Sequence, residues 1–375
     1  MANMLDYLHT CGYKRLNEQS FTDVDNLICS QLSYLDYSKA DRNLPQSLKI
    51  LDGIVGFGVM AQDNCALFRL AIDQKRFCDS KAFRYTSEFS EADTRQFAAI
   101  TFLLPDNTAF VSFRGTDSTI VGWKEDFMLS FTTPVPAQVL AVQYLNDIGS
   151  LLDCPLRVGG HSKGGNLAIY ASAFCNEAVQ KHIITVYSND GPGFEDKVLS
   201  SEGYRRIKTR IRRFIPEFSA VGILMDSDSE VTVVKSNSVG FYQHNPYSWQ
   251  VNGTDFVKLP YTSLGSDMIS TSQRDWFRAL SVEKREKYTN LLFDLLLSGN
   301  ARTLRELRTD PSSLLSAVHA AKNLSQEDKE ELAKLAKQVM TSLYAGSSAA
   351  VRERFEKWTV QMKAKIKAIE EELQS

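Results

Sequence analysis

The residues of this chain whose types and spacing best predict chemistry surround Ser162. They read Gly160-His-Ser-Lys-Gly164 and match the pattern G-x-S-x-G, in which a serine on a sharp turn acts as a nucleophile. Residues 156–159 predict a strand before the turn, and the small residues of 165–173 predict a helix after it. The turn strains the serine backbone and closes only where Gly160 and Gly164 have no side chains. The alternative is a glycine-rich turn with a serine that has no chemical role.

The same turn directs the backbone amide of the next residue, Lys163, at the carbonyl oxygen of a bound substrate. We therefore predict that this amide is one donor of an oxyanion hole. We interpret the Lys163 side chain as a solvated charge or a charge at the rim of the substrate site, and not as a catalytic base.

A nucleophilic serine needs a base, and histidine is the side chain best suited to that role near neutral pH. The chain has five histidines: His9, His161, His182, His244 and His319. His161 adjoins the nucleophile, where the turn directs its side chain away, and His182 opens a predicted strand. His9 and His319 lie in helical segments outside the predicted sheet. His244 lies in a turn-rich loop after the last predicted strand, and we predict that it is the base rather than a surface histidine.

Strand and helix patterns alternate through the first two thirds of the chain. Predicted strands cover 98–104, 109–113, 156–159, 183–187, 211–215 and 230–234, and predicted helices cover 24–35, 138–152 and 166–179. The first two strands, separated by a turn at 105–108, predict a hairpin. The alternation that follows is typical of an α/β fold in which helices flank a mostly parallel sheet. We assign residues 1–265 to one catalytic domain that includes the N-terminal helical segment.

Residues 266–375 predict a C-terminal helical extension, because glycine and proline become sparse and apolar residues fall at helical spacing. Ser325-Gln-Glu-Asp328 matches a capping box at a helix start. One apolar stripe comprises Val351, Phe355, Trp358, Met362, Ile366, Ile369 and Leu373. The stripe fits a helix that packs on its own domain, a helix that binds a partner or a second copy of the chain, or a helix at a membrane surface.

Residues 113–116, Phe-Arg-Gly-Thr, end the predicted hairpin, and Trp123-Lys-Glu-Asp126 follows at short range. With the turn around Ser162, these motifs resemble the class 3 lipases, which are serine hydrolases of the α/β-hydrolase fold. Ser-Lys-Gly-Gly-Asn-Leu-Ala, Ser-Asn-Asp-Gly-Pro-Gly-Phe and a late Gln-His motif are similar to a bacterial lipase-like family of unknown function. The resemblance, over residues 21–251, implies that Thr116 supplies an oxyanion-hole donor and that His161 is a packing residue. The alternative for Thr116 is a turn residue that bonds its own backbone.

The carboxylate of a catalytic triad holds the histidine tautomer and stabilises the imidazolium. Class 3 lipases have an aspartate where this chain has Ser219, so the resemblance supplies no acid at that position. Asp190 follows the strand after the serine turn, and the glycines and proline next to it predict a tight turn at the same edge of the sheet. We predict Asp190 as the acid, which preserves the order Ser, Asp, His of this fold. The rivals are Glu217, Asp226 and Asp228.

The composition disfavours several classes of function. A net charge of -2 gives no field for nucleic acid or strongly anionic membranes, and no segment is apolar enough to span a membrane. No secretory signal is recognisable and the six cysteines are unpatterned, so we expect a cytoplasmic protein with reduced thiols. The chemistry predicted here requires no metal or organic cofactor.

The expected chemistry is the two-step hydrolysis of a lipid-like or other acyl ester through an acyl-enzyme. Residues 123–131 predict a lid, an acyl pocket or a helix that covers the sheet. A peptidase or an acyltransferase uses the same triad. The missing lipase acid also motivates a different class, a lipase-like module that has lost turnover and binds or regulates a partner.

Overall fold

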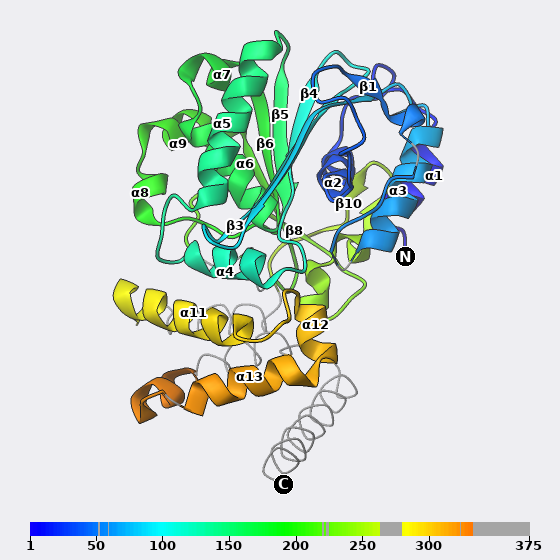
Figure 1. The fold of residues 1–375 in the computed structure, drawn as a ribbon. Coiled ribbons are helices and arrows are strands. Elements are labelled where there is room, and N and C mark those ends of the chain that lie inside the picture. Colours follow the sequence, from blue (N-terminus) through cyan, green and yellow to red (C-terminus); the bar gives the residue numbers. More distant parts are fainter. Residues whose placement is uncertain are drawn as a thin grey trace.

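A computed structural model of the protein describes residues 1–51, 53–58, 60–219, 221–222, 225–262, 280–322 and 324–332. Within these residues, nine strands form one sheet in the order β1-β2-β3-β4-β5-β6-β7-β8-β11 (Figure 1). Its strands are β1 (Gln46–Ser47), β2 (Lys81–Ser90), β3 (Arg95–Leu103), β4 (Ala109–Phe113), β5 (Leu156–His161), β6 (Ile183–Asn189), β7 (Ile211–Pro216), β8 (Val231–Val234) and β11 (Lys258–Leu259). Two short strands, β9 (Val251–Asn252) and β10 (Asp255–Phe256), pair separately.

The centre of the sheet is parallel and its outer parts are antiparallel. β4, β5, β6, β7 and β8 run parallel to one another, whereas β1, β2, β3 and β4 form antiparallel pairs, as do β8 and β11. β3 and β4 form the predicted hairpin, with Ala99 opposite Phe113. All six predicted strands are confirmed within a few residues at their ends. The sequence did not predict β2, whose pairing shifts register between Phe83 and Thr86 and so breaks its alternation of apolar and polar residues.

Helices cover both faces of the sheet, and each face has its own apolar core. One face is covered by α1 (Met4–Cys11), α2 (Asp23–Leu32) and α3 (Ala61–Asp73), and the other by α5 (Pro136–Leu151), α6 (Lys163–Phe174), α7 (Glu177–His182), α8 (Asp196–Leu199) and α9 (Glu202–Ile207) (Figure 1). Neighbouring residues of a strand point to opposite faces, so Phe110 of β4 lies in the first core and Val111 lies in the second. The parallel strands are therefore buried on both sides, which holds their carboxyl ends in fixed positions.

Two predicted helices differ from the observed ones at their ends. The helix expected over 24–35 begins at Asp23 and ends at Leu32, and the Thr22 side chain caps it by accepting a hydrogen bond from Asp25 N. The helix expected over 166–179 is two helices. α6 ends at Phe174 because Cys175 adopts an extended conformation, and α7 follows.

A helical layer lies beyond α4 (Ile120–Met128) and contains α11 (Val282–Leu297), α12 (Leu304–Thr309) and α13 (Pro311–Lys322) (Figure 1). Phe293 of α11 meets Phe127 of α4 edge-on, with ring centroids 5.4 Å apart, and Ile120 is buried in the same apolar cluster. Asp328 N donates to Ser325 Oγ at 3.1 Å, as the predicted capping box requires. The predicted domain boundary at 265 and the predicted apolar stripe over 351–373 both lie outside the described residues.

A sheet with a parallel centre, helices on both faces and a serine turn between β5 and α6 together define an α/β-hydrolase fold. All six cysteines are free thiols, as the sequence predicted. In the part of the chain that the structure describes, no helix combines the length and apolarity that crossing a bilayer requires.

Candidate active site

Ser162 occupies the turn between β5 and α6 in a backbone conformation that serine rarely adopts. Its φ is +59° and its ψ is -131°, and Lys163 is the first residue of α6. A Cβ added to Gly160 would lie 2.4 Å from the carbonyl carbon of Gly164, and one added to Gly164 would lie 2.1 Å from Phe113 O. Neither position admits a side chain, which is the requirement that the sequence pattern predicted.

The end of β4 runs directly beside this turn. A Cβ added to Gly115 would lie 3.2 Å from Ser162 Cβ and 2.5 Å from His161 O. The next residue, Thr116, donates its hydroxyl hydrogen to Asp126 Oδ2 of α4. The alternative in which the Thr116 hydroxyl bonds its own backbone is therefore wrong. Thr116 lies in the segment next to the nucleophile, as a residue of an oxyanion hole must.

Asp190 and His244, far apart in the sequence, are in direct contact. The Asp190 carboxylate is buried, and His244 Nδ1 donates to its Oδ2 at 2.5 Å, while the His244 side chain keeps 19% of its surface exposed. Ser162 N donates to Asn189 O at 2.9 Å, so the segment that carries Asp190 also adjoins the serine turn. A histidine whose Nδ1 is bound to a carboxylate presents Nε2 as its proton acceptor.

The position of Asp190 is fixed by a turn at the end of β6. Its φ is +52°, and its backbone N donates to Phe214 O of β7 at 2.7 Å. Its other carboxylate oxygen, Oδ1, accepts hydrogen bonds from Ser219 Oγ at 2.5 Å and from Gly222 N at 3.1 Å. Ser219, which stands where class 3 lipases have an aspartate, thus binds the carboxylate of Asp190.

Two of the three rival carboxylates contact groups other than His244, and the third rival, Asp226, is placed by its backbone. Glu217 Oε1 lies 3.5 Å from Ser236 N. Asp226 pairs through its backbone with Phe194. Asp228 accepts a hydrogen bond from Tyr204 Oη at 2.7 Å and forms an ion pair with Lys208.

His161 is a buried packing residue, as the resemblance implied, but its ring lies against the predicted base. Its Nε2 donates to the backbone O of His244 at 2.9 Å, and the two ring centroids are 4.6 Å apart. Tyr34 Oη lies 3.3 Å from His161 Nδ1. Burial and the neighbouring His244 lower the pKa of His161 to about 3, so this ring is neutral. No pattern in the sequence indicated this contact.

The interpretation of the Lys163 side chain as a solvated charge or a charge at the rim of the substrate site is wrong. The side chain is fully buried, and Nζ forms an ion pair at 2.8 Å with Glu125 Oε2 of α4, which is itself fully buried. Asp126 Oδ1 lies 3.9 Å from the same Nζ. Burial raises the pKa of Asp126 to about 6, although Lys163 and the Thr116 hydroxyl act in the opposite direction. Glu125 and Asp126 were visible in the sequence only as part of a lipase-like motif.

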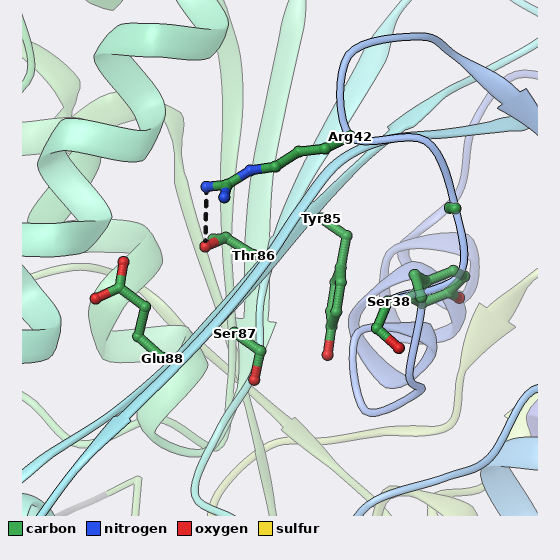
Figure 2. A pocket seen from close by; sticks show the side chains of 8 residues that line it. Ser38, Arg42, Tyr85, Thr86, Ser87 and Glu88 are labelled. Atoms are coloured by element: carbon green, nitrogen blue, oxygen red, sulfur yellow. Dashed lines mark hydrogen bonds between the residues drawn. The ribbon is translucent and has the colours of Figure 1, made fainter.

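α4 spans most of the segment predicted as a lid, an acyl pocket or a covering helix, and its contacts are those of a helix that covers the sheet. Its inner face is tied to α6 through Glu125, and its outer face packs on α11 through Phe127. A cavity of about 270 Å³ lies elsewhere, between β2 and the segment that follows α2. Figure 2 shows Arg42 reaching across this cavity to Thr86 Oγ1 at 3.4 Å. None of the predicted site residues lines it.

The fold and this arrangement define a lipase-like protein of the α/β-hydrolase class. The chain belongs to the Mbeg1-like family, whose model matches residues 71–294, more than half of its length. A comparison with curated proteins found no match.

Solved structures similar to this chain are lipases of low sequence identity. A deletion mutant of the Rhizomucor miehei lipase propeptide complex has 19% identity and a TM-score of 0.33, over 50% of this chain and 65% of that one. The chain thus spans just under two thirds of that lipase. The M37 lipase has 14% identity and a TM-score of 0.38, over 87% of this chain and 98% of that one.

Proposed function

We propose that this chain is a serine ester hydrolase in which Ser162 is the nucleophile, His244 the base and Asp190 the acid. The observation that carries the proposal is the contact of the buried Asp190 carboxylate with His244 Nδ1, beside a strained serine turn. A buried carboxylate stabilises the positive charge of a protonated histidine, whereas a neutral amide such as that of asparagine does not.

The reaction proceeds in two steps. His244 Nε2 takes the proton of Ser162 Oγ, which attacks the ester carbonyl, and the amides of Thr116 and Lys163 stabilise the oxyanion. The protonated His244 then gives its proton to the departing alcohol, and an acyl-serine remains. Water, deprotonated by His244, attacks the acyl-serine, and His244 returns this proton to Ser162 Oγ as the acyl–Oγ bond breaks and the carboxylic acid leaves. The Lys163 amide suits its role because the first N–H groups of α6 have no partner within the helix.

The substrate class that we propose is an acyl ester, including esters of lipids. The motifs shared with class 3 lipases and membership of the Mbeg1-like family support a lipase-like site. A panel of acyl esters of increasing chain length, measured beside peptide substrates and beside esters with an added alcohol acceptor, separates ester hydrolysis from peptidase and acyltransferase activity. We expect hydrolysis of esters alone.

Covalent labelling with a fluorophosphonate tests the nucleophile directly. We expect the wild type to be labelled and Ser162→Ala to remain unlabelled. Ser172→Ala is the matched control, because Ser172 is a buried serine of α6 whose Oγ has no hydrogen-bond partner. Absence of labelling of the folded wild type would overturn the proposal and favour a lipase-like module that binds or regulates a partner without turnover.

A further inference from the structure

Lys163 and Glu125 form a buried ion pair next to the serine turn, although the turn does not require an ion pair to form. Both side chains are fully buried, with Nζ and Oε2 2.8 Å apart. Removing two charges from water costs several kcal/mol for each ion, roughly, and a buried pair seldom stabilises a fold more than apolar residues of similar size. The turn itself requires only small residues at 160 and 164. The pair therefore calls for an explanation beyond stability.

Every hydrogen of the Lys163 ammonium group has an acceptor. Besides Glu125, Nζ donates to the backbone O and to the side-chain Oε1 of Gln96 in β3, each at 2.9 Å. Glu125 in turn accepts from Gln96 N at 3.1 Å and from Ala137 N, in the first turn of α5, at 2.8 Å. The pair thus joins α4, α6, β3 and α5 at one buried point.

The two consecutive carboxylates of α4 hold the two residues that we propose as oxyanion-hole donors. Glu125 binds the side chain of Lys163, and Asp126 accepts the hydroxyl hydrogen of Thr116. An oxyanion hole works only when both donors lie about 2.7–3.1 Å from the developing negative charge. α4 thus links the side chains of the two residues that carry these donors.

We propose that Glu125 is a positioning residue of the oxyanion hole, which acts through Lys163 to fix the first turn of α6 relative to Thr116. This inference rests on the proposed function of Ser162. Glu125 contacts no reacting atom. Its role is to hold the Lys163 amide where the tetrahedral intermediate needs a donor.

The double variant Lys163→Met/Glu125→Gln tests the inference, because it removes both charges and keeps one amide oxygen that can accept from one of the two backbone N–H groups that Glu125 binds. We expect it to fold cooperatively. Its kcat on an acyl ester falls about tenfold or more while KM changes less than about threefold, since the lost interaction acts in the transition state. An alkyl boronic acid, which forms a tetrahedral adduct on the serine, binds about tenfold more weakly.

A second buried ion pair of this chain provides a matched control. Arg76 and Asp25 are both fully buried and join α2 to the segment after α3, and among the described residues none of the proposed site contacts them. Arg76→Met/Asp25→Asn lowers Tm and leaves kcat, KM and boronic acid affinity unchanged. A merely structural role for Glu125 would give this same result.

Wild-type kcat and boronic acid affinity in the Lys163→Met/Glu125→Gln variant would overturn the inference and leave the proposed function intact. If that variant does not fold, Glu125→Asp is the alternative test. It keeps the negative charge but moves the carboxylate away from Lys163 Nζ by the length of one methylene group. The same loss of kcat supports the inference, and wild-type kcat refutes it. A wild type without hydrolysis or labelling overturns the proposed function, and the inference with it.

Discussion

Two buried clusters flank the Ser162 turn, and they differ in how they are closed. On one side Asp190 is buried, but the His244 ring that it binds keeps 19% of its side-chain surface exposed. On the other side Glu125 and Lys163 have no exposed surface. The side that exchanges a proton with a substrate must be reached by that substrate, whereas a side that only holds backbone positions works best when closed. The difference in exposure thus agrees with the proton transfer that we propose for His244 and the positioning that we propose for Glu125.

His161 and His244, on one side of the turn, also differ in exposure, because His161 is buried and His244 is partly exposed. His161 is buried, and its pKa of about 3 keeps it neutral at every pH at which a serine hydrolase works. A neutral ring 4.6 Å from the His244 ring does not oppose the positive charge that the proposed mechanism places on His244. A neutral His161 therefore does not compete for the proton of His244, the residue that we propose as the base.

Removal of the charge on Asp190 gives the largest expected effect. Asp190→Asn lowers kcat about 10⁴-fold, because an amide neither holds the His244 tautomer nor stabilises the imidazolium. Steady-state hydrolysis of an acyl ester measures this. Glu217→Gln is the control and changes kcat less than about twofold, since Glu217 contacts Ser236 rather than His244. Nearly intact activity of Asp190→Asn would refute the assignment of the acid.

Loss of the Thr116 hydroxyl has a smaller effect because it loosens one donor of the oxyanion hole and leaves the base intact. Thr116→Val no longer donates to Asp126. We expect kcat to fall about 10²-fold, at the lower end of the range for an oxyanion-hole donor, with little change in KM. Fluorophosphonate labelling slows in parallel. A kcat within about twofold of the wild type would show that the position of Thr116 does not depend on its hydrogen bond to Asp126.

The strands and the serine turn were predictable because their signals are local. Ser162 and its flanking glycines are contiguous, and the prediction of Asp190 as the acid rested on chain order and on the turn that follows it. The side-chain environment of Lys163 was not predictable, since its partner Glu125 is distant in sequence and belongs to another element. The contact of His161 with His244 was hidden for the same reason. Sequence patterns predict which face of a helix or strand is buried, but they do not predict which side chains from distant elements form contacts with each other.

His161 and Asp126, on opposite sides of the serine turn, affect the pH dependence of stability in opposite directions, and unfolding measurements can test this. His161 has its pKa lowered from 6.5 to about 3, so the unfolded chain binds the extra proton and stability falls as pH drops below 6.5. Asp126 has its pKa raised from 3.8 to about 6, so the folded chain binds the extra proton and stability rises as pH drops below 6. The two contributions partly cancel in the wild type.

We expect His161→Gln and Asp126→Asn to change the pH dependence of stability in opposite directions. Urea unfolding near pH 4.5 and near pH 7.5 gives the difference in free energy of unfolding between the two conditions. Relative to the wild type, His161→Gln becomes more stable at pH 4.5 than at pH 7.5 by about 2 kcal/mol. Asp126→Asn becomes less stable at pH 4.5 than at pH 7.5 by a similar amount. Shifts of the same sign in both variants would contradict the opposed titration.

The smallest expected effect on activity comes from the outer face of α4. Phe293→Ala removes a buried ring that packs on Phe127, and it lowers the free energy of unfolding by about 3 kcal/mol. Glu125 holds the inner face of α4 independently, so kcat changes less than about threefold. Phe89→Ala, at a half-exposed ring of β2, is the control and changes neither quantity. A fall in kcat of about tenfold in Phe293→Ala, with KM unchanged, would contradict this expectation. It would show that the packing of α11 on α4 also affects the position of the oxyanion hole.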